Sequence, residues 1–268
     1  MKIDSRKIFI ISVLAVCVIA INLAVYFAIT QKPEKDANEV IIDTQSLTEN
    51  FYNIFDNSIN IQRNEVNISK ENNEKDIVYT NYTNKENLEK KYKLDINIPY
   101  LNINNETAKS INQEINSLFY KKAQNIISNS NVYTVYSVNY KAYVNDNILS
   151  LVINASLKEG EKAQRIIIKT YNYNISSNNI LDIKNILQYR KITEEYAQVN
   201  INDTIEKANI EAKKYQQLGY NKLIRNTNDN MYKLNNTKVF FVGENKAIYI
   251  IYPYGNSSYT SELDLLVI

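Results

Sequence analysis

The clearest pair of side chains that could do chemistry is Glu262 and Asp264, near the end of the chain. They stand two residues apart in ELDLLVI, which is predicted to be a strand, so the two side chains would share one face at a spacing of about 6.6–7 Å. Inverting glycosidases hold two carboxylates about 6.5–9.5 Å apart. The alternative is a solvated strand face with Leu263 and Leu265 directed inward, and we favour this structural interpretation.

Most other catalytic chemistry lacks the residues that it needs. The chain has no histidine, which excludes a Ser-His-Asp triad, a Cys-His pair and His-ligated zinc. Its single cysteine, Cys17, lies in an apolar run, its four glycines are too scattered for a phosphate-binding loop, and it has no Ser-x-x-Lys motif. Glu194 and Glu195 open a predicted helix, where acidic residues favour the helix dipole. We therefore expect no catalytic residue, no metal and no cofactor, with carboxylate chemistry as the alternative.

Binding chemistry is better represented, because the chain has 22 tyrosines. Several of them surround Gly255-Asn256-Ser257-Ser258, a turn predicted to join two apolar strands. Rings on a rigid hairpin give contact area at a low cost in entropy, although a half-buried tyrosine is also ordinary in a strand. The candidate binding residues are therefore Tyr252, Tyr254, Asn256 and Tyr259.

Residues 8–29 form an apolar run without a charge. As a helix this run would be about 33 Å long, enough to cross a hydrocarbon core of roughly 30 Å. Lys2, Arg6 and Lys7 precede it, which favours a cytoplasmic N-terminus. A cleaved signal peptide is the alternative, but the run is long and has no A-x-A site, and Val16 before Cys17 disfavours lipoprotein processing. We predict a cytoplasmic stub at 1–7, a transmembrane helix at 8–29 and an extracellular remainder.

Beyond this run, the charged and Asn-rich residues 30–87 are predicted to be a stalk. In KYKLDINIPY, apolar and polar residues alternate as in a half-buried strand that stops at Pro99. An amphipathic helix follows, with Asn104 or Asn105 as its N-cap. Its apolar stripe comprises Ala108, Ile111, Ile115, Leu118, Phe119, Ile126 and Ile127.

Three strand-like runs between residues 132 and 175, separated by turn sequences, predict an antiparallel meander. A short helix in LDIKNILQ, a longer helix over 192–217 that stops before Gly219, and three further strands complete the chain. This order predicts an α+β fold with antiparallel sheets packed on two amphipathic helices, in two modules at 88–185 and 186–268. With 31 basic and 29 acidic residues, the chain shows no charge bias toward nucleic acid.

Three stretches together resemble a known family of exterior domains: LDINIPYLNINNETAKSINQEI, ILSLVINASLKEGEKAQRIIIKTYNYNI with NNILDIKNIL, and KVFFVGENKAIYIIYPYGNSSYTSELDLLVI. From about Leu88 to Ile268, the chain resembles the exterior part of RsiV-type anti-sigma factors of Gram-positive bacteria, which binds lysozyme. It also resembles the accessory domain of PdaC-type peptidoglycan deacetylases. The resemblance implies an extracytoplasmic binding or sensor module of the cell envelope, with a lysozyme-like protein or peptidoglycan as ligand.

The chain departs from this family pattern in two respects. No deacetylase domain is expected. A cytoplasmic sigma factor is not an expected partner either, because a specific interface covers about 800 Å² on each partner and seven residues precede the predicted span; the alternative is a misplaced start codon with a longer tail missing. The sequence therefore predicts a protein that binds its partner outside the membrane. The alternatives are a carboxylate-dependent glycan hydrolase and a structural envelope protein without a ligand.

Overall fold

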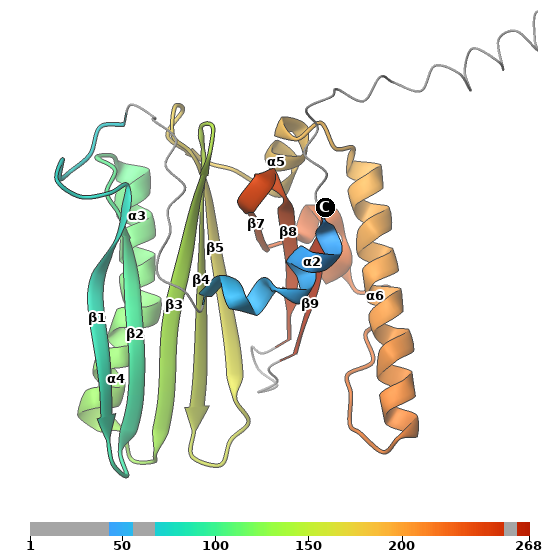
Figure 1. The fold of residues 1–268 in the computed structure, drawn as a ribbon, viewed down its shortest axis with the longest axis horizontal. Coiled ribbons are helices and arrows are strands. Elements are labelled where there is room, and N and C mark those ends of the chain that lie inside the picture. Colours follow the sequence, from blue (N-terminus) through green and yellow to red (C-terminus); the bar gives the residue numbers. More distant parts are fainter. Residues whose placement is uncertain (1–42, 56–67, 255–261) are drawn as a thin grey trace, which may run out of the picture. The chain divides into compact units, whose positions relative to one another are not determined.

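A computed structural model of the chain describes residues 43–55, 68–254 and 262–268, all of which belong to one compact unit. The fold is α+β, as predicted, with a six-stranded sheet in the order β1 to β6 and a three-stranded sheet in the order β7-β8-β9 (Figure 1). No helix within these ranges is long and apolar enough to cross a membrane. The predicted span at 8–29 and the stub at 1–7 lie outside the described residues.

The six-stranded sheet contains the predicted meander, which is confirmed. Its neighbouring strands are antiparallel, except that β2 and β3 pair in parallel because a helical segment carries the chain back between them. Its strands are β1 (Val78–Leu88), β2 (Tyr92–Leu101), β3 (Thr134–Asn145), β4 (Ile148–Glu159), β5 (Arg165–Asn174) and β6 (Asn179–Ile180).

Strand β1 corrects the stalk that the sequence predicted over residues 30–87. Its sequence is polar, and only every second residue is partly buried over most of its length. As the edge strand it pairs its backbone with β2 and needs little apolar surface, so composition alone does not reveal it. Phe51, which follows helix α2 (Thr44–Glu49), is also buried, at 1 % exposure. The predicted module boundary after residue 185 falls inside helix α5 (Ile183–Tyr189).

Strand β2 continues through Pro99, where the sequence predicted that it would stop. Proline has no N–H to donate to a ladder, so it needs an irregular partner strand. Strand β1 provides one: Thr80 lies opposite Pro99 and Tyr82 lies opposite Ile98, which leaves Asn81 as a bulge.

The predicted amphipathic helix is present but interrupted. Asn105 is its N-cap, and its side chain accepts a hydrogen bond from the backbone N–H of Ala108 at 2.9 Å. Helix α3 (Glu106–Ile115) leads through a π-helical turn (Asn116–Tyr120) into α4 (Lys121–Asn129). The wider turn breaks the 3.6-residue period, so Leu118 is 47 % exposed instead of joining the predicted apolar stripe.

The second half of the chain follows the predicted order. It comprises α5, α6 (Glu194–Gln217), β7 (Val239–Val242), β8 (Ile248–Pro253) and β9 (Leu263–Val267). Thr193 is the N-cap of α6, and Glu194 and Glu195 lie in its first turn, as expected from the helix dipole. Gly219, just after α6, has a φ of +86°, which glycine adopts without strain.

Apolar contacts arrange these elements in four layers (Figure 1). Helices α3 and α4 pack on one face of the six-stranded sheet. The three-stranded sheet packs on the other face, where Phe241 stacks between Tyr143 and Tyr249 with ring centroids 5.8 Å and 4.4 Å apart. Helices α5 and α6 cover the outer face of the three-stranded sheet. Strand β9 is therefore covered on both faces.

Candidate functional site

The predicted binding hairpin is described only in part. Tyr252 and Tyr254 lie at the end of β8, whereas Asn256 and Tyr259 lie outside the described residues. The Tyr252 side chain is only 3 % exposed, and its ring packs edge-to-face on Tyr232 with centroids 5.2 Å apart. Tyr252 thus belongs to the core under α6, and the prediction of a contact role for it is corrected.

Tyr254 lies in a closed polar network with Arg225 and Asp264. The Tyr254 hydroxyl donates to a carboxylate oxygen of Asp264 and forms a 2.8 Å hydrogen bond with the hydroxyl of Tyr232. Arg225 donates to both oxygens of the same carboxylate, from Nε and Nη2, at 2.8 Å each. The guanidinium carbon also lies 5.4 Å from the centroid of the Tyr254 ring. This ion pair is buried, with side-chain exposures of 7 % for Arg225 and 6 % for Asp264.

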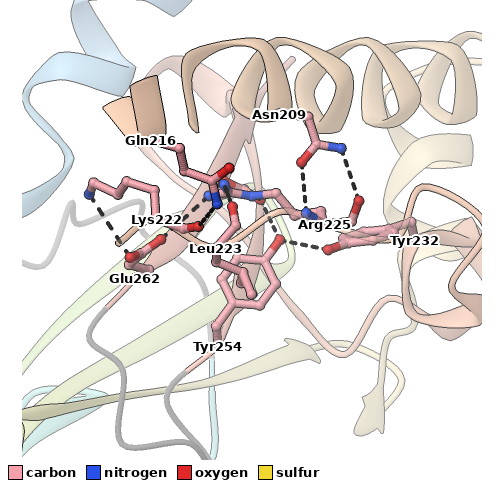
Figure 2. Close-up of polar contacts among 9 residues, drawn as sticks. Asn209, Gln216, Lys222, Leu223, Arg225, Tyr232, Tyr254 and Glu262 are labelled. Carbon is pink, nitrogen blue, oxygen red and sulfur yellow. Dashed lines mark hydrogen bonds and ion pairs between the residues drawn. The ribbon is translucent and has the colours of Figure 1, made fainter. Parts of the chain in front are cut away.

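Helix α6 positions the loop that carries Arg225 (Figure 2). The Asn209 side chain accepts from the backbone N–H of Arg225 at 2.7 Å and donates to its carbonyl at 2.9 Å. About two helical turns of α6 further on, Gln216 donates to the carbonyl of Lys222 at 3.0 Å. Arg225 itself donates from Nη1 to the carbonyl of Leu223 at 2.6 Å. Hydrogen bonds therefore hold this loop to α6 through Asn209 and Gln216, and to β9 through Asp264.

The protonation of the network fits a structural role. Burial, followed by the hydrogen bond to Asp264, raises the pKa of Tyr254, so its phenol remains a donor. Burial alone would lower the pKa of Arg225, but the hydrogen bonds and charge of Asp264 outweigh this, and the pKa is raised. Neither side chain can therefore act as a general base near neutral pH.

The two carboxylates of the sequence-predicted pair have different surroundings. Asp264 is buried, which corrects the expected solvated face, because α6 and its following loop cover that side of β9. Glu262 is more open, at 26 % side-chain exposure, and its oxygens lie 3.9 Å from Lys222 Nζ and from Arg225 Nη2. Arg225 thus contacts both carboxylates and occupies both oxygens of Asp264. This arrangement makes ion pairs and leaves Asp264 no free oxygen for an acid–base step.

An open cleft of about 380 Å³ lies beside the network, lined in part by Glu211, Tyr215, Lys222 and Glu262. Tyr215 is 40 % exposed and Tyr220 is 62 % exposed, and their rings meet edge-to-face at 6.0 Å. Lys222 Nζ lies 5.7 Å from the centroid of the Tyr215 ring. Tyr215 and Lys222 line the cleft, and Tyr220 lies beside it in contact with Tyr215; we call these three residues the aromatic rim. The site therefore consists of a buried, fixed base beneath an exposed rim.

Sequence reasoning missed Arg225 and Asn209, the residues that hold this site together. Arg225 lies 16 residues from Asn209 and 39 residues from Asp264 in the chain, so no local motif joins them. Only a weak signal in the sequence pointed to Arg225. Arginine is much scarcer than lysine in this chain, and the planar guanidinium group suits a buried carboxylate. In the described ranges, no group of three or more His, Cys, Asp or Glu side chains could hold a metal ion.

No protein-family model and no curated protein sequence matches this chain. Two solved structures that are similar to it are crystal structures of DUF3298 family proteins. The one from Pseudomonas aeruginosa is 11% identical, with a TM-score of 0.38, over 65% of this chain and 78% of that chain. The one from Bacteroides fragilis is 12% identical, with a TM-score of 0.30, over 65% of this chain and 79% of that chain.

Proposed function

We propose that this chain is a membrane-anchored binding or sensor module of the bacterial cell envelope, which binds its ligand without chemically changing it. Residues 8–29 would cross the membrane with the N-terminus in the cytoplasm, and the α+β unit would lie outside the cell. Support for the anchor comes from the uncharged apolar run and the basic residues before it. The resemblance to exterior envelope domains supports the location of the unit.

One observation carries the proposal of binding: the Arg225–Asp264–Tyr254 network fixes the base of a cleft whose aromatic rim is exposed. Tyrosine and arginine are enriched among the residues that dominate protein interfaces, and rigid rings lose little entropy on binding. The carboxylates that could have served hydrolysis are held in ion pairs with Arg225. The site therefore suits recognition better than cleavage.

We propose a lysozyme-like protein as the first ligand for the aromatic rim, with peptidoglycan as the second. The sequence resemblance supports both candidates. A folded protein suits an exposed rim because Tyr215 and Tyr220 could enter recesses of a partner while Lys222, Glu211 and Glu262 match charges around them.

The test is a binding measurement with the full-length chain in detergent, using immobilised lysozyme and, separately, purified peptidoglycan. Replacing Tyr215 and Tyr220 by alanine should weaken binding to the true ligand by about 1–3 kcal/mol. Tyr196→Ala is the matched control, because Tyr196 is 55 % exposed on the same helix but at its other end. An equal loss in the control, or no binding to either ligand, would contradict the proposal.

The anchor has its own test. The chain should fractionate with membranes, and protease added to intact wall-free cells should remove everything after about residue 32. A released soluble form with a new N-terminus near Thr30 would instead show that the apolar run is a cleaved signal peptide.

A further inference from the structure

A second cleft, larger than the one beside the aromatic rim, lies on the helix-covered face of the six-stranded sheet. Its volume is about 510 Å³, and it opens between strands β1 and β2 and helix α3 with the following π-helical turn. Ligand pockets in proteins typically measure about 300–1,000 Å³. We call it the α3 cleft. It shares no lining residue with the cleft beside the aromatic rim.

Two irregularities of the backbone meet at the α3 cleft. Asn81, the bulged residue of β1, lines it from the sheet. Asn116 and Tyr120, at the two ends of the π-helical turn, line it from the helix. Bulges occur preferentially next to active sites, and π-helical turns are frequent at functional sites. Either irregularity alone could be a packing detail, but here both shape the wall of one cleft.

The α3 cleft is close to neutral. Among its lining residues Lys109 is the one with a charged side chain, and its ammonium lies 2.9 Å from the carboxylate of Glu106. Tyr100 lines the cleft with its hydroxyl donating to Glu71 at 2.7 Å. The lining thus offers no uncompensated charge to a phosphate, a nucleic acid or a metal ion. Its ligand must therefore be recognised by hydrogen bonds and apolar contact.

The amide and phenol groups of the cleft supply both kinds of contact. Asn81, Gln113 and Asn116 are exposed, and each primary amide carries two donors and one acceptor. The rings of Tyr82 and Tyr120 meet edge-to-face with centroids 4.9 Å apart. The base of the cleft is apolar and includes Ile98, Pro99 and Ile115.

One lining amide is not available to a ligand. Asn112 donates to the carbonyl of Leu101 at 2.9 Å and accepts from its N–H at 2.8 Å. These bonds fix α3 against β2. They make the α3 cleft a preformed site, since its two walls are locked together.

We propose that the α3 cleft binds a neutral glycan, and that its ligand class is the N-acetylated oligosaccharide. Each sugar ring offers hydroxyl groups that donate and accept, an acetamido group that pairs with a side-chain amide, and an apolar face that can lie on tyrosine rings. A neutral peptide is the competing occupant, added as a strand along β1. The bulge at Asn81 opposes this, because bulges twist an edge strand away from strand addition.

This inference rests on the proposed function in one respect, because peptidoglycan is one of the ligands considered there, but it can be tested separately. The probe is chitotetraose, a neutral chain of four N-acetylglucosamine units, titrated into the full-length chain in a detergent without a sugar headgroup. Cellotetraose has the same backbone without acetamido groups and should bind about tenfold or more weakly. The double variant Gln113→Ala with Asn116→Ala should weaken chitotetraose binding about tenfold or more, since it removes two hydrogen-bonding amides. Alanine is a good helix former, so both changes should preserve α3 and its turn.

Asn131→Ala is the matched control. Asn131 is an exposed asparagine in the loop after α4, outside the α3 cleft, and its loss should change chitotetraose affinity by less than about twofold. The inference is overturned if chitotetraose does not bind or if its binding is unchanged in the double variant. It is also overturned if a neutral tetrapeptide binds the α3 cleft and chitotetraose does not. If lysozyme or peptidoglycan still binds through the aromatic rim in that case, the proposed function stands. If chitotetraose binds the α3 cleft while the rim variants change nothing, the assignment of the rim fails and the inference stands.

Discussion

The Arg225–Asp264–Tyr254 network and the α3 cleft both combine polar side chains with tyrosine rings, but they use the polar groups in opposite ways. Beside β8 and β9, the hydroxyl of Tyr254 and the carboxylate of Asp264 are both bonded within the protein, and Arg225 is buried with them. In the α3 cleft, Gln113 and Asn116 expose their amides to solvent beside tyrosine rings. Polar groups that are hydrogen-bonded within the protein stabilise the fold, whereas exposed polar groups on a rigid wall can form hydrogen bonds with a ligand. Polar side chains beside tyrosine rings can therefore stabilise the fold in the network and bind a ligand in the α3 cleft.

The largest effect that this comparison predicts comes from breaking the buried ion pair. Asp264→Ala removes the carboxylate that Arg225 binds through two hydrogen bonds and leaves Glu262, 3.9 Å away, as its nearest remaining carboxylate, which should destabilise the fold by about 3–5 kcal/mol. Glu262→Gln, two residues away and more exposed, should cost less than about 1 kcal/mol. Denaturant unfolding of both variants measures the difference. Equal effects would show that the network is not a stabilising element.

Alkaline pH should weaken the same region. Burial raises the pKa of Tyr252 to about 12, above the ordinary value near 10, so as pH rises the unfolded chain loses this proton first. The stabilisation from this group is fully present below about pH 10 and is lost as pH rises through the folded pKa. The loss of unfolding free energy reaches about 2 kcal/mol by about pH 11.5. Tyr252→Phe removes this titration and should make the alkaline fall shallower. Parallel alkaline falls in wild type and variant would contradict the burial of this phenol.

A smaller loss is expected when the network keeps its ion pair but loses one hydroxyl. Tyr254→Phe retains the ring beside Arg225 and removes the hydrogen bonds to Asp264 and Tyr232. The expected destabilisation is about 1.5 kcal/mol, measured by thermal or denaturant unfolding. A neutral outcome would place the Tyr254 hydroxyl outside the stabilising network and return this residue to the list of ligand contacts.

The smallest stability effect should come from the α3 cleft. Asn116→Ala changes an exposed amide in the π-helical turn and should alter the free energy of unfolding by less than about 0.5 kcal/mol. A loss above about 1 kcal/mol would mean that the amide supports the turn, and the contrast between the two regions would disappear.

The sequence anticipates the elements that bury one regular face. The meander of β3, β4 and β5 and the helices α3 and α6 follow their periodicity and caps. Strand β1 escaped prediction because an edge strand can be held by its backbone with few apolar residues. Leu118 was wrongly assigned to the buried stripe because a π-helical turn shifts the helical period, and no residue in the local sequence indicates this turn.

The candidate site was harder to predict than the fold, for physical reasons. Asp264 alternates with Leu263 and Leu265, so periodicity assigned it to solvent, but β9 is covered on both faces and alternation cannot distinguish two buried sides. Its partner Arg225 comes from a loop 39 residues away. The α3 cleft depends on a bulge and a π-helical turn, which arise from tertiary packing.

We propose that this protein binds an envelope ligand and does not cleave it. The most direct measurement incubates the full-length chain with purified peptidoglycan and records bound protein and released reducing ends in the same sample. We expect the chain to sediment with the peptidoglycan while reducing ends stay at the level of a protein-free blank, for wild type and Glu262→Gln alike. Reducing ends that rise with wild type and disappear with Glu262→Gln would contradict the account and identify a carboxylate-dependent hydrolase.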